Sequence, residues 1–154
     1  MVNKVSIILP NYNSSSTIIA TVNSIIKQSY KNWELIIIDD CSDIKTKKIL
    51  AKFEKIKKVK IIYLKKNYGA GFCRNFAIKK SNSQYLAFID SDDLWHKNKL
   101  KLQINYMEKN LYNFTYTNYK TFGITESHTK KIRTPRKFNL NSLIKNTSIA
   151  TSTM

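Results

Sequence analysis

Half of the ten acidic residues in this chain follow directly after two short apolar runs. Asp39–Asp40 ends the run Trp33–Ile38, and Asp90–Asp93 ends the run Tyr85–Ile89. A single acid at such a position usually caps the next helix. Five acids at two strand ends, in a chain of net charge +17, instead suggest a shared binding function.

The segment Asp90-Ser91-Asp92 is a DxD pattern, in which alternate residues at a strand end can direct two carboxylates at one site. Carboxylate oxygens are hard ligands suited to Mg²⁺ or Mn²⁺, which commonly take phosphate oxygens as further ligands. A divalent ion held there would neutralise a diphosphate leaving group. We therefore predict a Mn²⁺ or Mg²⁺ site within Asp90–Asp93.

A second candidate site is the segment Asn67–Asn75, which holds two of the three glycines in the chain, Gly69 and Gly71. Glycines at a helix N-terminus allow close backbone approach, and the helix dipole favours an anion there. Arg74, one of three arginines, lies one turn into that helix and could bind a phosphate or a base carbonyl. The segment is not a dinucleotide fingerprint, because Arg74 replaces the third glycine and the loop does not follow the first strand.

Apolar runs alternate with helical patterns along the chain, which predicts an α/β fold with parallel strands covered on both faces. We expect strands at Val5–Leu9, Trp33–Ile38, Val59–Leu64, Tyr85–Ile89 and Phe114–Tyr119. We expect helices from Ile18 to about Gln28, after Ser42 or Asp43, over Gly71–Lys80, and around Leu100–Leu111. In open sheets of this class, ligands bind beyond the carboxyl ends of the strands.

The pattern weakens after Lys120. Thr125–Lys137 is polar and basic and predicts an exposed loop or hairpin, Leu140–Lys145 predicts a short helix, and Ile149–Met154 predicts the start of a strand. Because an α/β sheet should not end in mid-strand, we expect the domain to be truncated at the C-terminus.

Composition excludes several classes of protein. The 154 residues suffice for one domain, and 42% of them are hydrophobic, which is enough for a core. The sequence has no run of about 18 apolar residues, the length that a membrane-spanning helix needs, so we expect no membrane-spanning segment. Two cysteines, Cys41 and Cys73, cannot form a disulfide framework or a four-ligand zinc site, so we expect a reducing, cytoplasmic location.

The charge of +17 has two interpretations. It could attract phosphate-rich partners, or it could reflect the lysine-rich composition that an AT-rich genome gives to any solvated surface. A basic cluster late in the chain would favour peripheral association with an anionic membrane. Its members are Lys130, Lys131, Arg133, Arg136 and Lys137.

Four blocks of sequence, ILPNYN, SIIKQSYKNWELIIIDDCS, NYGAGFCRN and YLAFIDSDDLW, resemble the N-terminal half of family 2 inverting glycosyltransferases with the GT-A fold. The resemblance covers about residues 4 to 110. It implies transfer of a sugar from a nucleotide diphosphate, usually UDP, to a saccharide or lipid-linked acceptor, as in bacterial surface polysaccharide or lipopolysaccharide synthesis. It also implies one domain over 1–154, with a nucleotide-sugar-binding core at 1–119 and the start of an acceptor-side region at 120–154.

The resemblance implies a role for each matched residue. The nucleotide-sugar site would comprise Pro10, Tyr12, Asp39, Asp40, Asn67, Gly71, Arg74, Asp90 and Ser91. Pro10 and Tyr12 would line the base, and Asp40 or its neighbour Asp39 would accept a hydrogen bond from the uracil imide. Asp92 would be the principal metal ligand, joined by Asp90 and Asp93, although Asp93 could instead cap the next helix.

Two departures from the family accompany this resemblance. Cys41 stands where the family most often has glycine or another small residue. The general base of the family, an acid in a later loop, has no match, because Glu126 is the only acid after Glu108 and has unsuitable surroundings. We therefore expect the base beyond Met154.

Two alternative functions are less consistent with the sequence. A sugar nucleotidyltransferase would carry its glycines close to the first strand, where this chain has PNYNSSS. A nucleic-acid-binding module would suit the charge, but its basic face should not carry DxDD at its centre. We expect no nucleic-acid partner.

Overall fold

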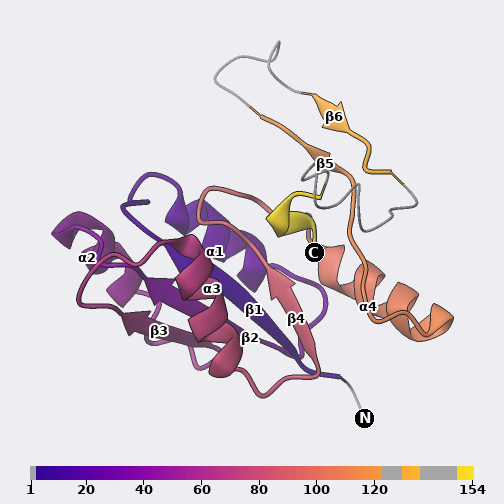
Figure 1. The fold of residues 1–154 in the computed structure, drawn as a ribbon, viewed down its shortest axis with the longest axis horizontal. Helices are drawn as coiled ribbons and strands as arrows, with labels where there is room; N and C mark the ends of the chain where they lie inside the picture. Colours follow the sequence, from indigo (N-terminus) through magenta and orange to yellow (C-terminus); the bar gives the residue numbers. More distant parts are fainter. Residues whose placement is uncertain (1–2, 123–129, 136–148) are drawn as a thin grey trace.

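The structure, a computed structural model, describes residues 3–122, 130–135 and 149–154. Four strands form one parallel sheet in the order β3-β2-β1-β4 (Figure 1). They are β1 (Val5–Asn11), β2 (Trp33–Asp39), β3 (Val59–Tyr63) and β4 (Tyr85–Phe88). The helices are α1 (Ile18–Ile26), α2 (Ile44–Ala51), α3 (Ala70–Lys79) and α4 (Lys99–Asn110).

The two central strands, β1 and β2, carry the apolar runs Ile7–Pro10 and Leu35–Ile38, because helices cover both of their faces. On one face, side chains such as Leu9 and Ile37 pack with Ile18 of α1, and this core continues to α2 and α4. On the other face, side chains such as Ile36 pack with Ala77 of α3. Figure 1 shows this three-layer arrangement, with α3 on the opposite side of the sheet from α1.

The prediction of a strand at Phe114–Tyr119 is wrong. Of these residues only Tyr119 belongs to a strand, β5 (Tyr119–Lys120), which pairs antiparallel with β6 (Lys131–Ile132) in a separate two-stranded sheet. The Tyr116 hydroxyl donates to the Pro135 carbonyl at 2.5 Å, so this segment is held by side-chain contacts and not by a strand ladder. Within the segment predicted as an exposed loop or hairpin, the structure describes residues 130–135, of which β6 pairs with β5, a strand that lies before that segment.

The prediction that a strand begins at Ile149–Met154 is also wrong. Thr151–Thr153 forms a short 3₁₀ helix, η2, which lies beside β4 and α4 (Figure 1). The Thr153 carbonyl accepts hydrogen bonds from the side chains of Lys99 and Gln103 of α4, and these contacts hold the short helix in place. The helix predicted at Leu140–Lys145 lies outside the described residues.

Lys99, at the start of α4, is buried against this C-terminal segment. Its ammonium group donates to the carbonyls of Thr153 (3.3 Å) and Met154 (3.1 Å) and to Gln103 Oε1, and lies 4.4 Å from the ring centre of Trp95. Burial disfavours the charged form and lowers the pKa of Lys99 to about 7 from its ordinary 10.5.

The lowered pKa of Lys99 predicts that stability depends on pH. Between about pH 7 and 10.5 the unfolded chain holds the Lys99 proton and the folded chain does not, so the free energy of unfolding rises with pH there. Lys99→Met removes this contribution. The difference in unfolding free energy between wild type and Lys99→Met should therefore grow with pH, by up to ~1.4 kcal/mol per pH unit. Urea denaturation from pH 7 to about 10 measures it, with Lys101→Met, exposed on the same helix, as the matched control. A constant difference across this range would contradict the burial argument.

Candidate functional site

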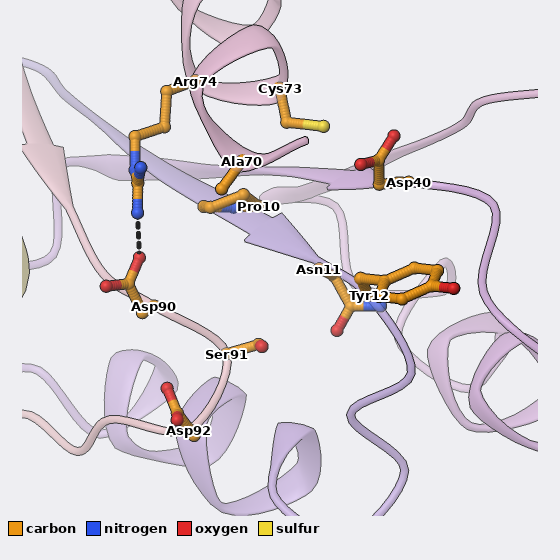
Figure 2. A pocket seen from close by; sticks show the side chains of 10 residues that line it. All are labelled: Pro10, Asn11, Tyr12, Asp40, Ala70, Cys73, Arg74, Asp90, Ser91 and Asp92. Carbon is orange, nitrogen blue, oxygen red and sulfur yellow. Dashed lines mark hydrogen bonds and ion pairs between the residues drawn. The ribbon is translucent and has the colours of Figure 1, made fainter. Parts of the chain in front are cut away.

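A pocket of about 330 Å³ opens where the carboxyl ends of β1, β2 and β4 meet the N-terminus of α3 (Figure 2). It is lined by Pro10, Asn11, Tyr12, Asp40, Ala70, Cys73, Arg74, Asp90, Ser91 and Asp92. Figure 2 shows Asp40 and Tyr12 on one side and Asp90 and Asp92 on the other. Six residues predicted from the sequence to bind the nucleotide sugar therefore share one cavity with Asp92, the predicted principal metal ligand.

Asp39 lies behind this pocket and does not line it. Its carboxylate is fully buried and accepts hydrogen bonds from Asn11 Nδ2 at 2.8 Å and from the Ser42 backbone N–H at 3.2 Å. The Ser42 hydroxyl in turn accepts from the Asn13 backbone N–H at 2.9 Å. Asp39 thus joins the ends of β1 and β2. Its neighbour Asp40, by contrast, lines the pocket.

Asp40 holds the loop that precedes α3. Its two carboxylate oxygens accept hydrogen bonds from the backbone N–H groups of Tyr68 (2.8 Å) and Gly69 (2.7 Å). Gly69 has φ +86°, a left-handed conformation that favours glycine. Apart from its neighbours in the helix, a Cβ at Gly71 would meet no atom of the described residues within 4 Å, and neither Gly71 nor Asn67 lines the pocket.

The turn after β2 explains the departure at Cys41. Cys41 has φ +63°, the left-handed region in which glycine is favoured and a side chain is strained. Its thiol lies 3.5 Å from the Lys65 carbonyl oxygen, on the segment that follows β3. A glycine or cysteine at this position therefore supports the same turn.

The N-terminal turn of α3 contributes Ala70, Cys73 and Arg74 to the pocket wall. The Cys73 thiol is buried, and burial raises its pKa to about 12, with the nearby Asp40 as a further cause. A thiol that stays protonated at neutral pH is a poor nucleophile. Cys73 therefore forms part of the wall and is not a reactive group.

Arg74 and Asp90 form an ion pair across the pocket, with 2.5 Å between Arg74 Nη2 and Asp90 Oδ1 (Figure 2). Arg74 Nε is buried and has no hydrogen-bond partner among the described residues. The sequence predicted both residues at the site but not their contact, because they lie on different elements.

Asp92 and Asp93 have different surroundings. Asp92 lines the pocket and makes no hydrogen bond or ion pair with any residue that the structure describes. Asp93 does not line the pocket; its carboxylate accepts a hydrogen bond from the Ser152 hydroxyl, and burial raises its pKa. Asp90 and Asp92 therefore line the pocket, and Asp93 does not.

The donor set fits a divalent cation that is completed by a substrate. In the described part of the chain, no group of three or more His, Cys, Asp or Glu side chains could hold a metal. Mg²⁺ and Mn²⁺ sites commonly use one or two carboxylates together with waters and phosphate oxygens. Asp92 with Asp90 matches that pattern. A structural zinc or calcium site would need more ligands from the protein.

Three contributors to the site were not predicted from the sequence: Asn11, Ala70 and Cys73. Asn11 is the last residue of β1, so its position at a strand end was a usable signal. Ala70 and Cys73 share the first turn of α3 with Arg74, and helical spacing could have found them.

A mostly parallel sheet with helices on both faces and acids at the strand ends is the arrangement of GT-A-type glycosyltransferases, as the resemblance implied. The structure of S. aureus TarS 1-349 in complex with UDP has TM-score 0.65 and 34% identity, over 69% of this chain and 32% of that one. The mannosyltransferase PcManGT from Pyrobaculum calidifontis shares the fold at TM-score 0.65 and 17% identity, over 77% of this chain and 34% of that one. The expected fold class is confirmed.

Residues 6–154 match glycosyl transferase family 2, and the chain belongs to that family. It is 38% identical over 152 residues to a putative teichuronic acid biosynthesis glycosyltransferase, TuaG, of Bacillus subtilis, covering 97% of this chain and 60% of that protein. It is 39% identical over 150 residues to the Escherichia coli enzyme WfgD, covering 97% of this chain and 58% of that protein. The chain thus spans about three-fifths of the length of these relatives. WfgD is a UDP-Glc:α-D-GlcNAc-diphosphoundecaprenol β-1,3-glucosyltransferase.

The different surroundings of the acids predict different effects on stability. Asp39→Asn places an amide N–H₂ against a buried N–H donor, either of Asn11 or of Ser42, which should lower the free energy of unfolding by about 1–3 kcal/mol. Asp92→Asn removes no contact within the described residues and should change it by less than about 0.5 kcal/mol. Urea denaturation of the two variants at pH 7 measures this contrast. Equal losses would contradict the structural role of Asp39.

Proposed function

We propose that this chain is the donor-binding part of an inverting glycosyltransferase that uses a UDP-sugar. The observation that carries the proposal is the pocket itself, with Asp40 on one side and the Asp90–Asp92 carboxylates on the other. A nucleotide sugar needs a base-recognition group and a diphosphate-binding group in one cavity. The TarS structures, determined in complex with UDP and with UDP-GlcNAc at 34% identity, support this choice of donor.

The base would bind on the Asp40 side. Each Asp40 oxygen already accepts one backbone N–H and keeps a second lone-pair direction. A carboxylate held by two such hydrogen bonds can accept another from the uracil imide N–H. Pro10 and the half-exposed ring of Tyr12 would cover the base.

The diphosphate would bind on the opposite side, beside Asp92. Asp92, together with Asp90, would hold Mn²⁺ or Mg²⁺, which neutralises the charge of the leaving diphosphate when it is bound. Arg74 orients Asp90 through their ion pair, and its guanidinium lines the same cavity, where its positive charge would attract a phosphate oxygen. Ala70, at the N-terminus of α3, places the positive end of a helix dipole at the same wall.

Transfer needs a general base that removes the proton from the acceptor hydroxyl as it attacks the anomeric carbon and UDP leaves. Such a displacement inverts the anomeric configuration. We assign the base to none of the described residues, and Glu126 lies outside them. General-base catalysis typically contributes about 10²–10⁴ to the rate.

The acceptor is proposed to be a saccharide, or a saccharide linked to a lipid, in bacterial surface polysaccharide synthesis. The names of TuaG and WfgD support this class, since one refers to teichuronic acid and the other to a diphosphoundecaprenol acceptor. No helix in the described residues is long and apolar enough to cross a bilayer. We propose peripheral association with the cytoplasmic face of the membrane, favoured by basic residues such as Lys130, Lys131 and Arg133.

The proposed metal site predicts that UDP affinity depends on Mn²⁺ through Asp92. Removing Mn²⁺ with EDTA should weaken UDP binding to the wild type by about tenfold or more, ~1.4 kcal/mol. Asp92→Asn should abolish this dependence. Calorimetric titration with and without Mn²⁺ measures both effects. Asp43→Asn, at the N-cap of α2, is the matched control. If UDP affinity ignores both EDTA and Asp92→Asn, the metal assignment is wrong.

The proposed base contact predicts a preference for UDP over CDP. Cytosine has no N–H at its ring N3 to donate to Asp40, and an unmet hydrogen bond in the pocket costs about 1–3 kcal/mol. The wild type should prefer UDP by about tenfold, and Asp40→Asn should reduce that ratio. The ratio of the UDP affinity to the CDP affinity isolates base recognition, because loosening of the Tyr68–Gly69 loop should weaken the binding of both nucleotides alike. Equal affinities for UDP and CDP in the wild type would refute the contact.

A further inference from the structure

The hydroxyl of Ser152 forms hydrogen bonds with both ends of the Asp90–Asp93 turn. Ser152 Oγ accepts a hydrogen bond from the Asp90 backbone N–H at 3.0 Å. The same oxygen donates to Asp93 Oδ2. Within the turn, the Asp93 backbone N–H also donates to the Asp90 carbonyl at 3.1 Å. Ser152 therefore fixes the separation of the two residues that enclose Ser91 and Asp92.

Ser152 is itself held by a buried frame. Its carbonyl accepts a hydrogen bond from Trp95 Nε1 at 2.9 Å, and the next carbonyl, of Thr153, accepts from Gln103 Nε2 at 3.1 Å and from the Lys99 ammonium at 3.3 Å. Ser152 is 9% exposed and Thr153 is 4% exposed. With so many fixed contacts, the Ser152 hydroxyl has little freedom to move away from the turn.

The other side of the turn is held by α1. The Thr21 hydroxyl, on the buried face of α1, donates to the Ser91 carbonyl at 3.0 Å. Neither Thr21 nor Ser152 lines the pocket. The turn is thus positioned from two sides by hydroxyl groups that need not touch the ligand, while Asp92 is left without a partner among the described residues.

We propose that Ser152 is a positioning residue for the cation site. By binding Asp93 it turns that carboxylate away from the pocket, and by binding the Asp90 backbone it sets the distance between the Asp90 and Asp92 carboxylates. The cation then meets two protein carboxylates, and its remaining positions stay open for diphosphate oxygens. This inference rests on the metal-dependent donor binding proposed above.

Ser152→Ala should lower the Mn²⁺-dependent part of UDP affinity by about tenfold, as loss of a hydrogen bond that orients a metal ligand does. UDP affinity in EDTA should stay at the wild-type value, because the base side of the pocket is untouched. Ser152→Thr keeps the hydroxyl and should restore Mn²⁺ dependence. Thr151→Ala, which removes the neighbouring hydroxyl, is the matched control. Electron paramagnetic resonance of Mn²⁺ with each variant and UDP gives a readout that is independent of turnover.

A second variant tests the same contact from its other end. Asp93→Ala removes the acceptor of one of the two Ser152 hydrogen bonds, so it should lose no more affinity than Ser152→Ala, and the double variant should lose no more than Ser152→Ala alone. Losses that add would show that Asp93 acts on the cation site independently of Ser152 and would overturn the inference. If Ser152→Ala does not fold, Asp93→Ala alone decides: a loss as complete as that of Asp92→Asn would contradict the positioning role.

The outcomes separate this inference from the proposed function. A wild type without Mn²⁺-dependent UDP binding would refute the metal site, and with it the role of Ser152. A wild type with that dependence, together with Ser152→Ala that retains it in full, would refute only the positioning role. Equal losses with Mn²⁺ and with EDTA in Ser152→Ala would indicate a general structural effect and would also refute it.

Discussion

The parallel pairing of β1 with β2 on one side and β4 on the other is the constraint on which the site depends. In this register Asn11 pairs with Asp39, and Ile8 pairs with Phe88. The chain must therefore leave β1, β2 and β4 at the same edge of the sheet, and the polar residues that follow each strand are brought together there. Segments about 80 residues apart in the sequence form one pocket for this reason alone.

The five acids at this edge divide between two tasks. Asp39 and Asp93 are turned away from the pocket and bind groups of the protein, on Asn11 and Ser42 in one case and on Ser152 in the other. The remaining three acids line the pocket. Like charges gathered at one edge would repel, and the partners of these acids offset that repulsion without consuming the carboxylate of Asp92. The basic surface of the chain therefore need not contribute to the site itself.

Much of the fold could be predicted from the sequence, because the first four strands are buried and give strong local signals. Runs such as Trp33–Ile38 pack against helices on both faces, so their own apolar character predicts a buried strand. Phe114–Tyr119 and Ile149–Met154 were predicted incorrectly, because both lie outside the central layers. Their conformation depends on contacts with Pro135 and with the side chains of α4.

The site was predictable by residue type but not by contact. Aspartates after strands could be recognised individually, and the resemblance ranked Asp92 above Asp93, but it left Asp39 open beside Asp40 and kept Asp93 among the metal ligands. The distinction within each pair depends on which way each carboxylate points, and it is set by distant partners such as Ser152. The Arg74–Asp90 ion pair was not predicted for the same reason, nor were the hydrogen bonds of Asp40 with the Tyr68 and Gly69 backbone.

The most direct test of the account is a crystal structure of this chain with UDP and Mn²⁺. The account predicts the uracil ring beside Pro10 and Tyr12 with its imide N–H donating to Asp40, and Mn²⁺ between Asp92 and the diphosphate. Nucleotide bound outside this pocket, or bound in reverse with uracil beside Asp92, would contradict it.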